Sequence, residues 1–195
     1  TFIAALEKAD ELIRISTFTD PVLEITEIAD RITKSGGKAL LFENNGTNFP
    51  LLINAFGSDR RIAMATGRDS FDEAVAETAD LLNELTGRKI TFPAKIRSLP
   101  ALLRIPGYLP SFKRGRGSCQ EVIHRDPDLD ILPVLKCWPH DGGRFITLPV
   151  VHTVHPLTGK TNAGMYRMQV LDKNRTAMHW QRHKKIGRAS CRERV

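Results

Sequence analysis

Chemically versatile side chains gather in two short segments near the C-terminal end of this chain. Residues 162–169 read Asn-Ala-Gly-Met-Tyr-Arg-Met-Gln, and residues 178–183 read Met-His-Trp-Gln-Arg-His. Residues 172–175 (Asp-Lys-Asn-Arg) are typical of a turn, so we predict two antiparallel strands joined there. Such a hairpin places an amide, a guanidinium, imidazoles, an indole and a phenol side by side. These groups suit an anionic, planar cofactor that is linked to a metal ion.

The spacing of these residues decides which of them can face one cavity. In a regular strand, successive side chains point to opposite faces, so Met165, Arg167 and Gln169 should share a face. Asn162 is out of phase with Arg167. Both can serve one site only if Gly164 introduces a bulge or a bend.

The residue types decide which chemistry the hairpin can support. The guanidinium of Arg167 is a planar fork that matches a carboxylate or a phosphate with two parallel hydrogen bonds. The amide oxygen of Asn162 and a neutral imidazole at His183 suit Mn²⁺ or Mg²⁺ that also takes phosphate oxygens. Two protein ligands are too few for a metal site, so a carboxylate from elsewhere is implied. A histidine on a strand is more often a core or surface residue, so residue types alone leave both interpretations open.

Composition places the chain among globular proteins and argues against two kinds of partner. Hydrophobic residues make up 41% and charged residues 26% of the 195 positions, as in ordinary globular proteins. No apolar run approaches the roughly 18 residues that a transmembrane helix needs. The net charge is +7, but residues 184–195 carry five basic side chains and one acidic side chain. The body of the chain has no basic stripe with interleaved aromatic residues, so we do not expect nucleic-acid binding.

The cysteines and the first residues indicate the compartment. Cys119, Cys137 and Cys191 form no Cys-x-x-Cys pair and are odd in number, which argues against a disulfide framework. The first eight residues are amphipathic and lack the basic and apolar regions of a signal peptide. We therefore expect a cytoplasmic protein in which Cys119 and Cys137 are buried, inert thiols.

Helical and strand patterns alternate in the first part of the chain. After an initial helix, residues 12–15 predict a short strand. Residues 25–32 carry apolar side chains at helical spacing and precede a glycine pair that predicts the helix end. Residues 38–43 and 50–54 predict two strands around an Asn-Asn-Gly turn. We expect the apolar stripes of these elements to form a core.

One more helix is predicted before the pattern changes. Ser70 and Glu73 have the spacing of a capping box, and Gly87 is expected to end the helix. Its apolar face, which we expect to lie in the core, consists of Phe71, Ala74, Val75, Thr78, Leu82 and Leu85.

The remaining sequence predicts a connector, a β-rich region and a tail. Prolines and a Lys-Arg-Gly-Arg-Gly run over residues 93–117 indicate a flexible, basic linker. Residues 120–124 and 145–155 are rich in Val, Ile and Thr and predict extended chain. We therefore predict an α+β fold. It comprises an N-terminal α/β domain over residues 1–92, the linker, an incomplete β-rich domain over residues 118–183, and a non-native tail over residues 184–195.

The chain resembles the UbiD family of non-oxidative decarboxylases over residues 1–183. Several separated motifs occur in the right order, which is more specific than any single motif. The matching segments are Leu23–Arg31, Ala39–Asn44, Gly117–Gln120, Cys137–Pro139, Phe145–Thr147, Asn162–Arg167 and Met178–His183.

The resemblance implies a decarboxylase that uses prenylated flavin mononucleotide (prenylated FMN). The cofactor would be held in a split β-barrel of FMN-binding type, with Mn²⁺ and K⁺ beside its phosphate. Asn162 and His183 would bind Mn²⁺, and Arg167 would act catalytically by gripping the substrate carboxylate. The residues that would contact the cofactor are Met165, Tyr166, Arg167, His179, Trp180, Gln181 and Lys184. The modified flavin would take up the electrons left behind when CO₂ departs.

The resemblance also implies a substrate class and partners. A matching family member would act on an aromatic acid of ubiquinone or menaquinone biosynthesis, such as a polyprenyl-hydroxybenzoate or a naphthoate. A flavin prenyltransferase would supply the cofactor, a prenylated substrate would bring peripheral association with a membrane, and the full-length parent would be a homo-oligomer. The family's third metal ligand, a glutamate, and its proton-donating acid lie beyond the residues present. We therefore expect an N-terminal fragment that is inactive alone.

Two other functions compete with this interpretation. A non-catalytic flavin-nucleotide binding module would use the same hairpin for the phosphate, but residues 118–183 supply too few strands to close a barrel. A basic adaptor for RNA or acidic partners would use Lys113–Arg116 and the tail. The flavin-binding module is the main alternative.

Overall fold

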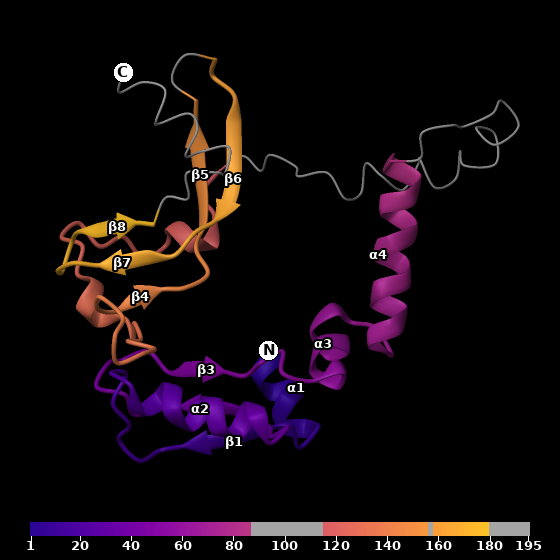
Figure 1. The fold of residues 1–195 in the computed structure, drawn as a ribbon, viewed down its shortest axis with the longest axis horizontal. Helices are drawn as coiled ribbons and strands as arrows, with labels where there is room; N and C mark the ends of the chain where they lie inside the picture. Colours follow the sequence, from indigo (N-terminus) through magenta and orange to yellow (C-terminus); the bar gives the residue numbers. More distant parts are fainter. Residues whose placement is uncertain (87–114, 156–157, 180–195) are drawn as a thin grey trace, which may run out of the picture. The chain divides into compact units, whose positions relative to one another are not determined.

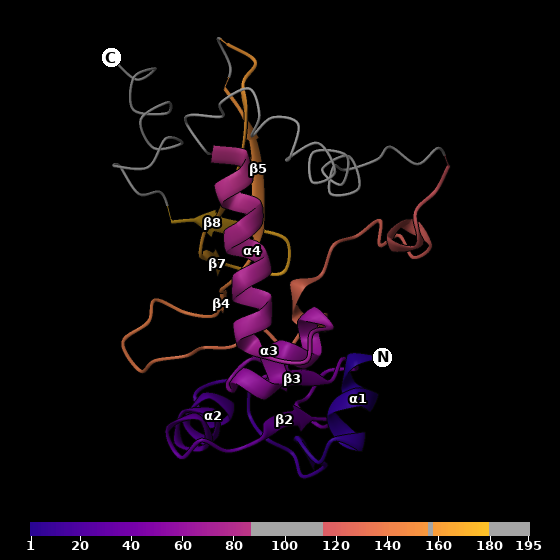
Figure 2. The same ribbon diagram turned by 90° about the vertical axis from the view of Figure 1, so that its right-hand side faces the viewer.

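The computed structural model describes residues 1–86, 115–155 and 158–179 (Figures 1 and 2). The chain divides into two compact units. Of the described residues, the first comprises residues 3–57, 126–155 and 158–179, and the second comprises residues 58–86 and 115–125.

The first unit begins with a small three-stranded sheet and two helices. The strand order is β1-β2-β3, with β1 parallel to β2 and β2 antiparallel to β3. The elements are α1 (Phe2–Lys8), β1 (Leu12–Ile15), α2 (Glu24–Lys34), β2 (Ala39–Phe42) and β3 (Leu51–Ile53). All five were predicted by the periodicity of the sequence, which confirms the expected α/β layer.

The core of this layer lies between α2 and β2. Ile25 of α2 and Leu40 and Phe42 of β2 are 0%, 1% and 0% exposed. Each such side chain contributes about 2 kcal/mol when it is removed from water. Ile28 and Ile32 of the same helix face pack against this cluster. The apolar stripe of α2 is therefore core, as its spacing predicts.

The later part of the first unit is tied to the same layer. Leu135 packs against the core cluster of Ile25, Leu40 and Phe42. Nearby, Val22 forms a parallel bridge with Lys136, and the Leu23 N–H donates to the Lys136 carbonyl at 3.0 Å. These contacts fix the segment that leads into the β-rich region.

Five short strands make up the β-rich region. One sheet has the order β4-β7-β8, and β5 pairs with β6 in a second sheet. The strands are β4 (Phe145–Ile146), β5 (Val150–Val154), β6 (Thr161–Met165), β7 (Met168–Val170) and β8 (Thr176–Met178). Within the described residues these sheets form no closed barrel. The mixed α/β fold agrees with the predicted α+β class.

The predicted hairpin is present as β7 and β8. Gln169 faces Ala177 in an antiparallel register. In the connecting turn, the Leu171 N–H donates to the Arg175 carbonyl at 3.0 Å, and the Arg175 Nε donates to the Asp172 carboxylate at 2.6 Å. The turn at residues 172–175 is confirmed.

The first predicted strand of that hairpin is wrong as a single element. Residues 161–165 form β6, which pairs with β5 and sets Asn162 opposite Thr153. The chain leaves this ladder at Tyr166 and Arg167, and β7 then pairs with β4 and β8. The expected alternation from Met165 to Gln169 is therefore interrupted.

The bulge or bend at Gly164, which would let Asn162 and Arg167 serve one site, is not formed at this residue. Gly164 stays in the ladder opposite Val151. A Cβ atom at this position would lie 2.7 Å from Cε2 of Tyr166. The Tyr166 ring therefore occupies the space that a larger side chain at position 164 would need. The ladder is interrupted two residues later, at Tyr166 and Arg167.

Two other extended segments differ from expectation. Residues 118–120 form a short 3₁₀ turn and residues 121–124 form no strand. The segment 145–155 is divided into β4 and β5, with residues 147–149 between them. Pro149 at the end of this break has no N–H to donate to a ladder.

The second unit contains α3 (Asp59–Thr66) and α4 (Phe71–Thr86). The Ser70 hydroxyl accepts from the Glu73 N–H at 3.1 Å, while the Glu73 carboxylate accepts from the Asp69 N–H at 3.0 Å. Ser70 therefore caps α4. The Glu73 carboxylate binds the N–H of Asp69, one residue before the Ser70 N–H that a capping box would use. Gly87, the expected helix end, lies outside the described residues.

The expectation that the apolar face of α4 is core is wrong. Phe71, Val75 and Leu82 are 37%, 48% and 54% exposed. Helical periodicity marks a face that needs a partner, but it does not identify that partner. Of the helices that the structure describes, none combines the length and the apolar composition that a bilayer crossing requires.

Candidate anion-binding site around Arg167

Arg167 forms a two-pronged ion pair with Asp141. Its Nη1 donates to Oδ1 at 2.9 Å and its Nη2 donates to Oδ2 at 2.6 Å. The side chain of Arg167 is 34% exposed and that of Asp141 is 14% exposed. Two parallel N–H···O bonds are the strongest arrangement of a guanidinium and a carboxylate. The planar fork predicted at Arg167 is therefore formed, and it holds a carboxylate of the chain itself.

The backbone around Asp141 explains how the carboxylate reaches this position. The Asp141 N–H donates to the Trp138 carbonyl at 3.1 Å, which closes a turn. The Gly142 carbonyl accepts from Nε2 of Gln169 at 2.8 Å. A Cβ atom on Gly142 would lie 3.2 Å from that Nε2 atom, so a larger residue would crowd the contact. The turn and β7 are thereby held together, with Asp141 facing Arg167.

Phe145 supports the guanidinium from one side. The Cζ atom of Arg167 lies 3.9 Å from the centroid of the Phe145 ring. A guanidinium over an aromatic face is stabilised by the ring quadrupole, by about 0.5–1 kcal/mol at exposed sites and more where water is excluded. In the sheet, Phe145 of β4 lies opposite Gln169 of β7. The ion pair and the ring together determine the orientation of Arg167.

The electrostatics of the pair keep both groups charged at neutral pH. The hydrogen bond from Arg167 holds the pKa of the Asp141 carboxyl below its usual range. The bond to Asp141 is also the main reason that the pKa of Arg167 is raised, with a smaller contribution from Cys137. The pair therefore carries no net charge, but only two of the five guanidinium N–H donors serve the carboxylate.

The other predicted cofactor contacts that the structure describes flank Arg167. Met165, 57% exposed, ends β6, and Tyr166 is buried at 7%. The Tyr166 ring lies against Gly164. The N–H of His179, which is exposed, donates to the Arg167 carbonyl at 3.0 Å. The described part of the site thus contains a thioether, a phenol and a guanidinium between the end of β6 and the start of β7. An imidazole follows the end of β8.

The predicted metal ligands are only partly described. Asn162 lies in β6, half-buried, opposite Thr153. His183 lies outside the described residues, as do Trp180, Gln181 and Lys184 of the predicted cofactor contacts. Within residues 1–86, 115–155 and 158–179, no group of three or more His, Cys, Asp or Glu side chains is placed to hold a metal ion. The described donors by themselves do not make a Mn²⁺ site.

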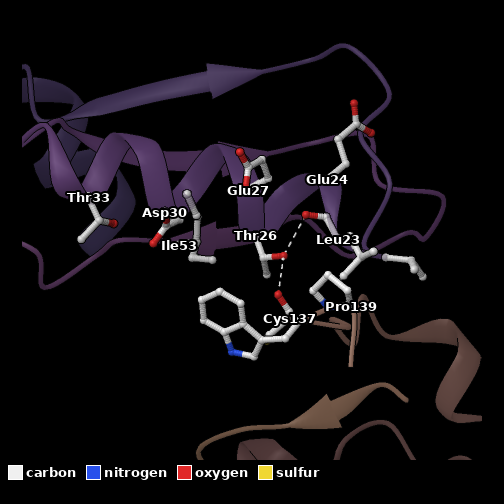
Figure 3. A pocket seen from close by; sticks show the side chains of 12 residues that line it. Leu23, Glu24, Thr26, Glu27, Asp30, Thr33, Ile53, Cys137 and Pro139 are labelled. Atoms are coloured by element: carbon white, nitrogen blue, oxygen red, sulfur yellow. Dashed lines mark hydrogen bonds between the residues drawn. The ribbon is translucent and has the colours of Figure 1, made fainter. Parts of the chain in front are cut away.

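A groove of about 720 Å³ lies beside α2 (Figure 3). Cys137, Trp138 and Pro139 form one wall, and α2 forms the other. The Thr26 hydroxyl donates to the carbonyls of Leu23 and Cys137 at 2.8 and 3.2 Å, joining the two walls. Two of the acidic side chains that line the groove are ion-paired, Glu27 with Arg31 and Asp30 with Lys34. A third, Glu24, accepts a hydrogen bond from the Asp20 N–H. The groove is therefore mainly apolar.

Sequence reasoning missed two residues that build the site. Asp141 was not singled out, and Phe145 was named only within an extended segment and within a motif of the family resemblance, with no role of its own. The available signal was an Asp-Gly-Gly sequence directly before a strand, which is typical of a turn but does not reveal an ion pair. Cys137 was expected to be buried, but it is half-buried. The side chain of Cys119 and all of Cys191 lie outside the described residues.

Comparison with known proteins now gives the context of this site. Residues 3–82 match the 3-octaprenyl-4-hydroxybenzoate carboxy-lyase N-terminal domain. Residues 111–194 match the 3-octaprenyl-4-hydroxybenzoate carboxy-lyase Rift-related domain. The second match includes Asp141, Phe145 and Arg167.

Related sequences and structures agree with these matches. An uncharacterized protein of Archaeoglobus fulgidus is 46% identical over 184 residues, which cover 94% of this chain and 37% of that protein. The UbiD-class enzyme HmfF of Pelotomaculum thermopropionicum, solved with prFMN, is similar with a TM-score of 0.67 and 22% identity. That likeness covers 99% of this chain and 40% of the enzyme.

A second solved structure shows the same likeness. The vanillic acid decarboxylase of Sedimentibacter hydroxybenzoicus has a TM-score of 0.68 and 25% identity, covering 99% of this chain and 38% of that chain. The fold is that of UbiD-class decarboxylases. The chain belongs to the UbiD family, and it spans about two-fifths or less of the length of these relatives.

Proposed function

We propose that the protein containing this chain is a decarboxylase that removes CO₂ from an aromatic carboxylic acid. We further propose a hydroxybenzoate or a naphthoate of ubiquinone or menaquinone biosynthesis as the substrate. Family membership supports the reaction class. The likeness to a vanillic acid decarboxylase supports an aromatic acid, because vanillic acid is one.

The observation that carries this proposal is the pairing of Arg167 with a carboxylate above an aromatic ring. Both oxygens of Asp141 meet the guanidinium, and the Phe145 ring lies 3.9 Å from Cζ. An aryl carboxylate needs the same two elements, a fork for its oxygens and an apolar surface for its ring. Asp141 takes two of the five N–H donors and the Cys137 side chain also interacts with the guanidinium. The donors that are left can still bind a second carboxylate on the same side chain.

The residues of the chain have distinct roles in this proposal. Arg167 binds and orients the substrate carboxylate. Met165 and Tyr166 supply apolar contact that excludes water from the cofactor, and excluding water strengthens the electrostatic interactions of the site. The other residues proposed to contact prenylated FMN are His179, Trp180, Gln181 and Lys184. The cofactor, when bound, supplies an electron sink for the electron pair that CO₂ leaves behind.

The proposal for the metal rests on the family resemblance. Asn162 and His183 would be ligands of Mn²⁺, with K⁺ nearby at the cofactor phosphate. An amide oxygen and an imidazole are suitable ligands for Mn²⁺, but the described donors do not complete a site. A glutamate outside this chain would be the third protein ligand. We derive no step of the reaction through the metal.

The activity of the whole protein requires more than this chain in our proposal. The chain covers 37% of the length of the Archaeoglobus relative. We propose that the proton-donating acid lies in the remainder and that the 195-residue chain alone releases no CO₂. We also propose a homo-oligomer in the cytoplasm, supplied with cofactor by a flavin prenyltransferase. A prenylated substrate would bring it to the membrane surface.

The test is CO₂ release by the full-length protein that carries this chain. The protein is reconstituted with prenylated FMN and Mn²⁺ and incubated with vanillate, 4-hydroxybenzoate and 1,4-dihydroxy-2-naphthoate. We expect CO₂ from at least one acid and a loss of at least about 100-fold in kcat/KM in Arg167→Met, because a lost charged contact to substrate costs several kcal/mol.

Arg175→Met is the matched control. Arg175 lies in the turn between β7 and β8, pairs with Asp172 and has a side chain that is 73% exposed. Its removal should leave kcat/KM within about twofold, since exposed ion pairs contribute little. Equal activity of Arg167→Met and the wild type would refute the assigned role of Arg167. No CO₂ from any aromatic acid would contradict the proposed reaction.

A further inference from the structure

We infer that Asp141 is a positioning residue that also lowers the affinity of Arg167 for the substrate carboxylate. The inference rests on the proposed function. It assigns Asp141 two effects, which are to hold the guanidinium in one orientation over Phe145 and to neutralise its charge. Both effects follow from the same two-pronged contact.

The positioning effect follows from geometry. Arg side chains carry several rotatable bonds, and fixing them costs free energy on binding. In this site the guanidinium is already held by two hydrogen bonds and by the ring of Phe145. Asp141 is itself held by its N–H bond to the Trp138 carbonyl. A substrate carboxylate therefore meets a preorganised fork.

The charge effect follows from the direction of the proposed reaction. In decarboxylation, the bond between the carboxyl carbon and the ring breaks. The electron pair of that bond is left behind, and the bound cofactor would supply its sink. The carboxylate departs as neutral CO₂, and a proton finally replaces it on the aromatic fragment. A cation at the carboxylate stabilises the ground state more than the transition state, because the negative charge leaves this position. Such binding lowers KM and also lowers kcat.

Asp141 limits this ground-state stabilisation. Its carboxylate is 14% exposed and touches the same guanidinium that the substrate would use. A second carboxylate on Arg167 is therefore repelled by Asp141 while it is attracted by Arg167. The substrate is oriented but not tightly held, which favours departure of CO₂. The lowered pKa of Asp141 is consistent with a charge that persists at neutral pH.

The test measures carboxylate binding separately from catalysis. The probe is 4-fluorobenzoate, titrated at pH 7 into the full-length protein that carries this chain and followed by ¹⁹F NMR. We expect weak binding by the wild type and binding about tenfold tighter by Asp141→Asn, because the repelling charge is removed. Asp141→Ser is a second neutral variant in case the amide variant does not fold, and Asp141→Glu should restore the wild-type affinity.

Asp130→Asn is the matched control. Asp130 forms an ion pair with Arg144 at 2.6 Å in the same unit, and its side chain is 43% exposed. Removing this carboxylate should leave the affinity within about twofold, since exposed pairs are weakly coupled to distant charges. If losing a negative charge anywhere in the chain were enough, Asp130→Asn would bind 4-fluorobenzoate more tightly, as Asp141→Asn does. That result would contradict a specific effect of Asp141.

Arg167→Met separates the inference from the proposed function. If 4-fluorobenzoate binds this variant as it binds the wild type, or binds none of the chains, Arg167 is not a carboxylate site and both proposals fail. If binding needs Arg167 but the neutral Asp141 variants bind no more tightly than the wild type, only the inference is overturned. In the full-length enzyme, Asp141→Asn should lower KM and kcat together, a combination that simple loss of structure does not produce.

Discussion

Arg167 places a permanent positive charge at the junction between two small sheets. Its neighbours decide what that charge can do. Asp141 takes two of its donors, Phe145 lies beneath it, and the His179 N–H binds its carbonyl. The ion pair and the ring leave the guanidinium one orientation, and the His179 bond holds the backbone of Arg167. At the scale of single residues, the proposed function depends on this orientation as much as on charge.

The Asp141–Arg167 pair predicts a specific dependence of stability on pH. The pKa of Asp141 is lowered in the folded chain, so the folded state prefers the ionised carboxylate more than the unfolded state does. The resulting stabilisation is present above the ordinary carboxyl pKa of 3.8 and is lost as the pH falls through the lower folded value. The difference in urea midpoint between wild type and Asp141→Asn should be constant from pH 7 to pH 5 and should shrink below about pH 4.

The measurement is a set of urea unfolding curves at fixed ionic strength. The wild type should lose stability on acidification more steeply than Asp141→Asn, because only the wild type carries the titrating group. Parallel pH dependences for the two chains would show that the pair does not contribute to stability.

Sequence reasoning found Arg167 but not its partner, for a physical reason. A guanidinium beside apolar residues is visible in the residue types. Asp141 lies 26 positions earlier, and its contact with Arg167 depends on how β4 pairs with β7. Local spacing carries no information on such a contact. The roles predicted for Asn162, His183 and the cofactor-facing residues stay predictions.

At the scale of elements, β6 and β7 are consecutive strands that belong to different sheets. The junction between them directs Tyr166 back over Gly164 and Arg167 toward Asp141. The strand break therefore positions the candidate site. Because the Tyr166 ring packs against Gly164, any side chain added at position 164 would collide with that ring.

Gly164→Ala should destabilise the first unit by about 1–3 kcal/mol. The added Cβ would lie 2.7 Å from Cε2 and 3.1 Å from the hydroxyl oxygen of Tyr166, whose side chain is buried. Because the ring is buried, moving it away from the added methyl group disturbs its packing. The measurement is the free energy of unfolding in urea, with tyrosine fluorescence reporting on the ring.

Ala163→Ser is the control for this prediction. Ala163 is the exposed neighbour of Gly164 in the same strand, and its replacement should change the free energy of unfolding by less than about 0.5 kcal/mol. Equal stability of Gly164→Ala and the wild type would contradict the close packing of Tyr166 on β6.

Elements with strong local signals were predictable, whereas their junctions were not. The apolar stripe of α2 follows from helical periodicity. The turn at residues 172–175 follows from its turn-forming residues. The break at Tyr166 depends on pairing with β5, which no local pattern encodes. The exposed face of α4 shows the same limit, since an amphipathic pattern requires a partner without naming it.

At the scale of the whole molecule, the two matched domains identify the family. The first unit joins the N-terminal layer to the β-rich region through Leu135 and the Val22–Lys136 bridge. The Arg167 site is therefore built on a segment fixed to a packed core. A site on a fixed segment is held more precisely than one on an unsupported loop.

The most direct test of the account is a crystal structure of the full-length protein with a bound aromatic carboxylate. We expect both carboxylate oxygens within about 3.2 Å of Arg167 nitrogens, with Asp141 still bonded to the same guanidinium. The ring of the ligand should lie near Met165 and Tyr166. A ligand bound elsewhere, with Arg167 contacting only Asp141, would contradict the central claim that Arg167 is the carboxylate-binding residue.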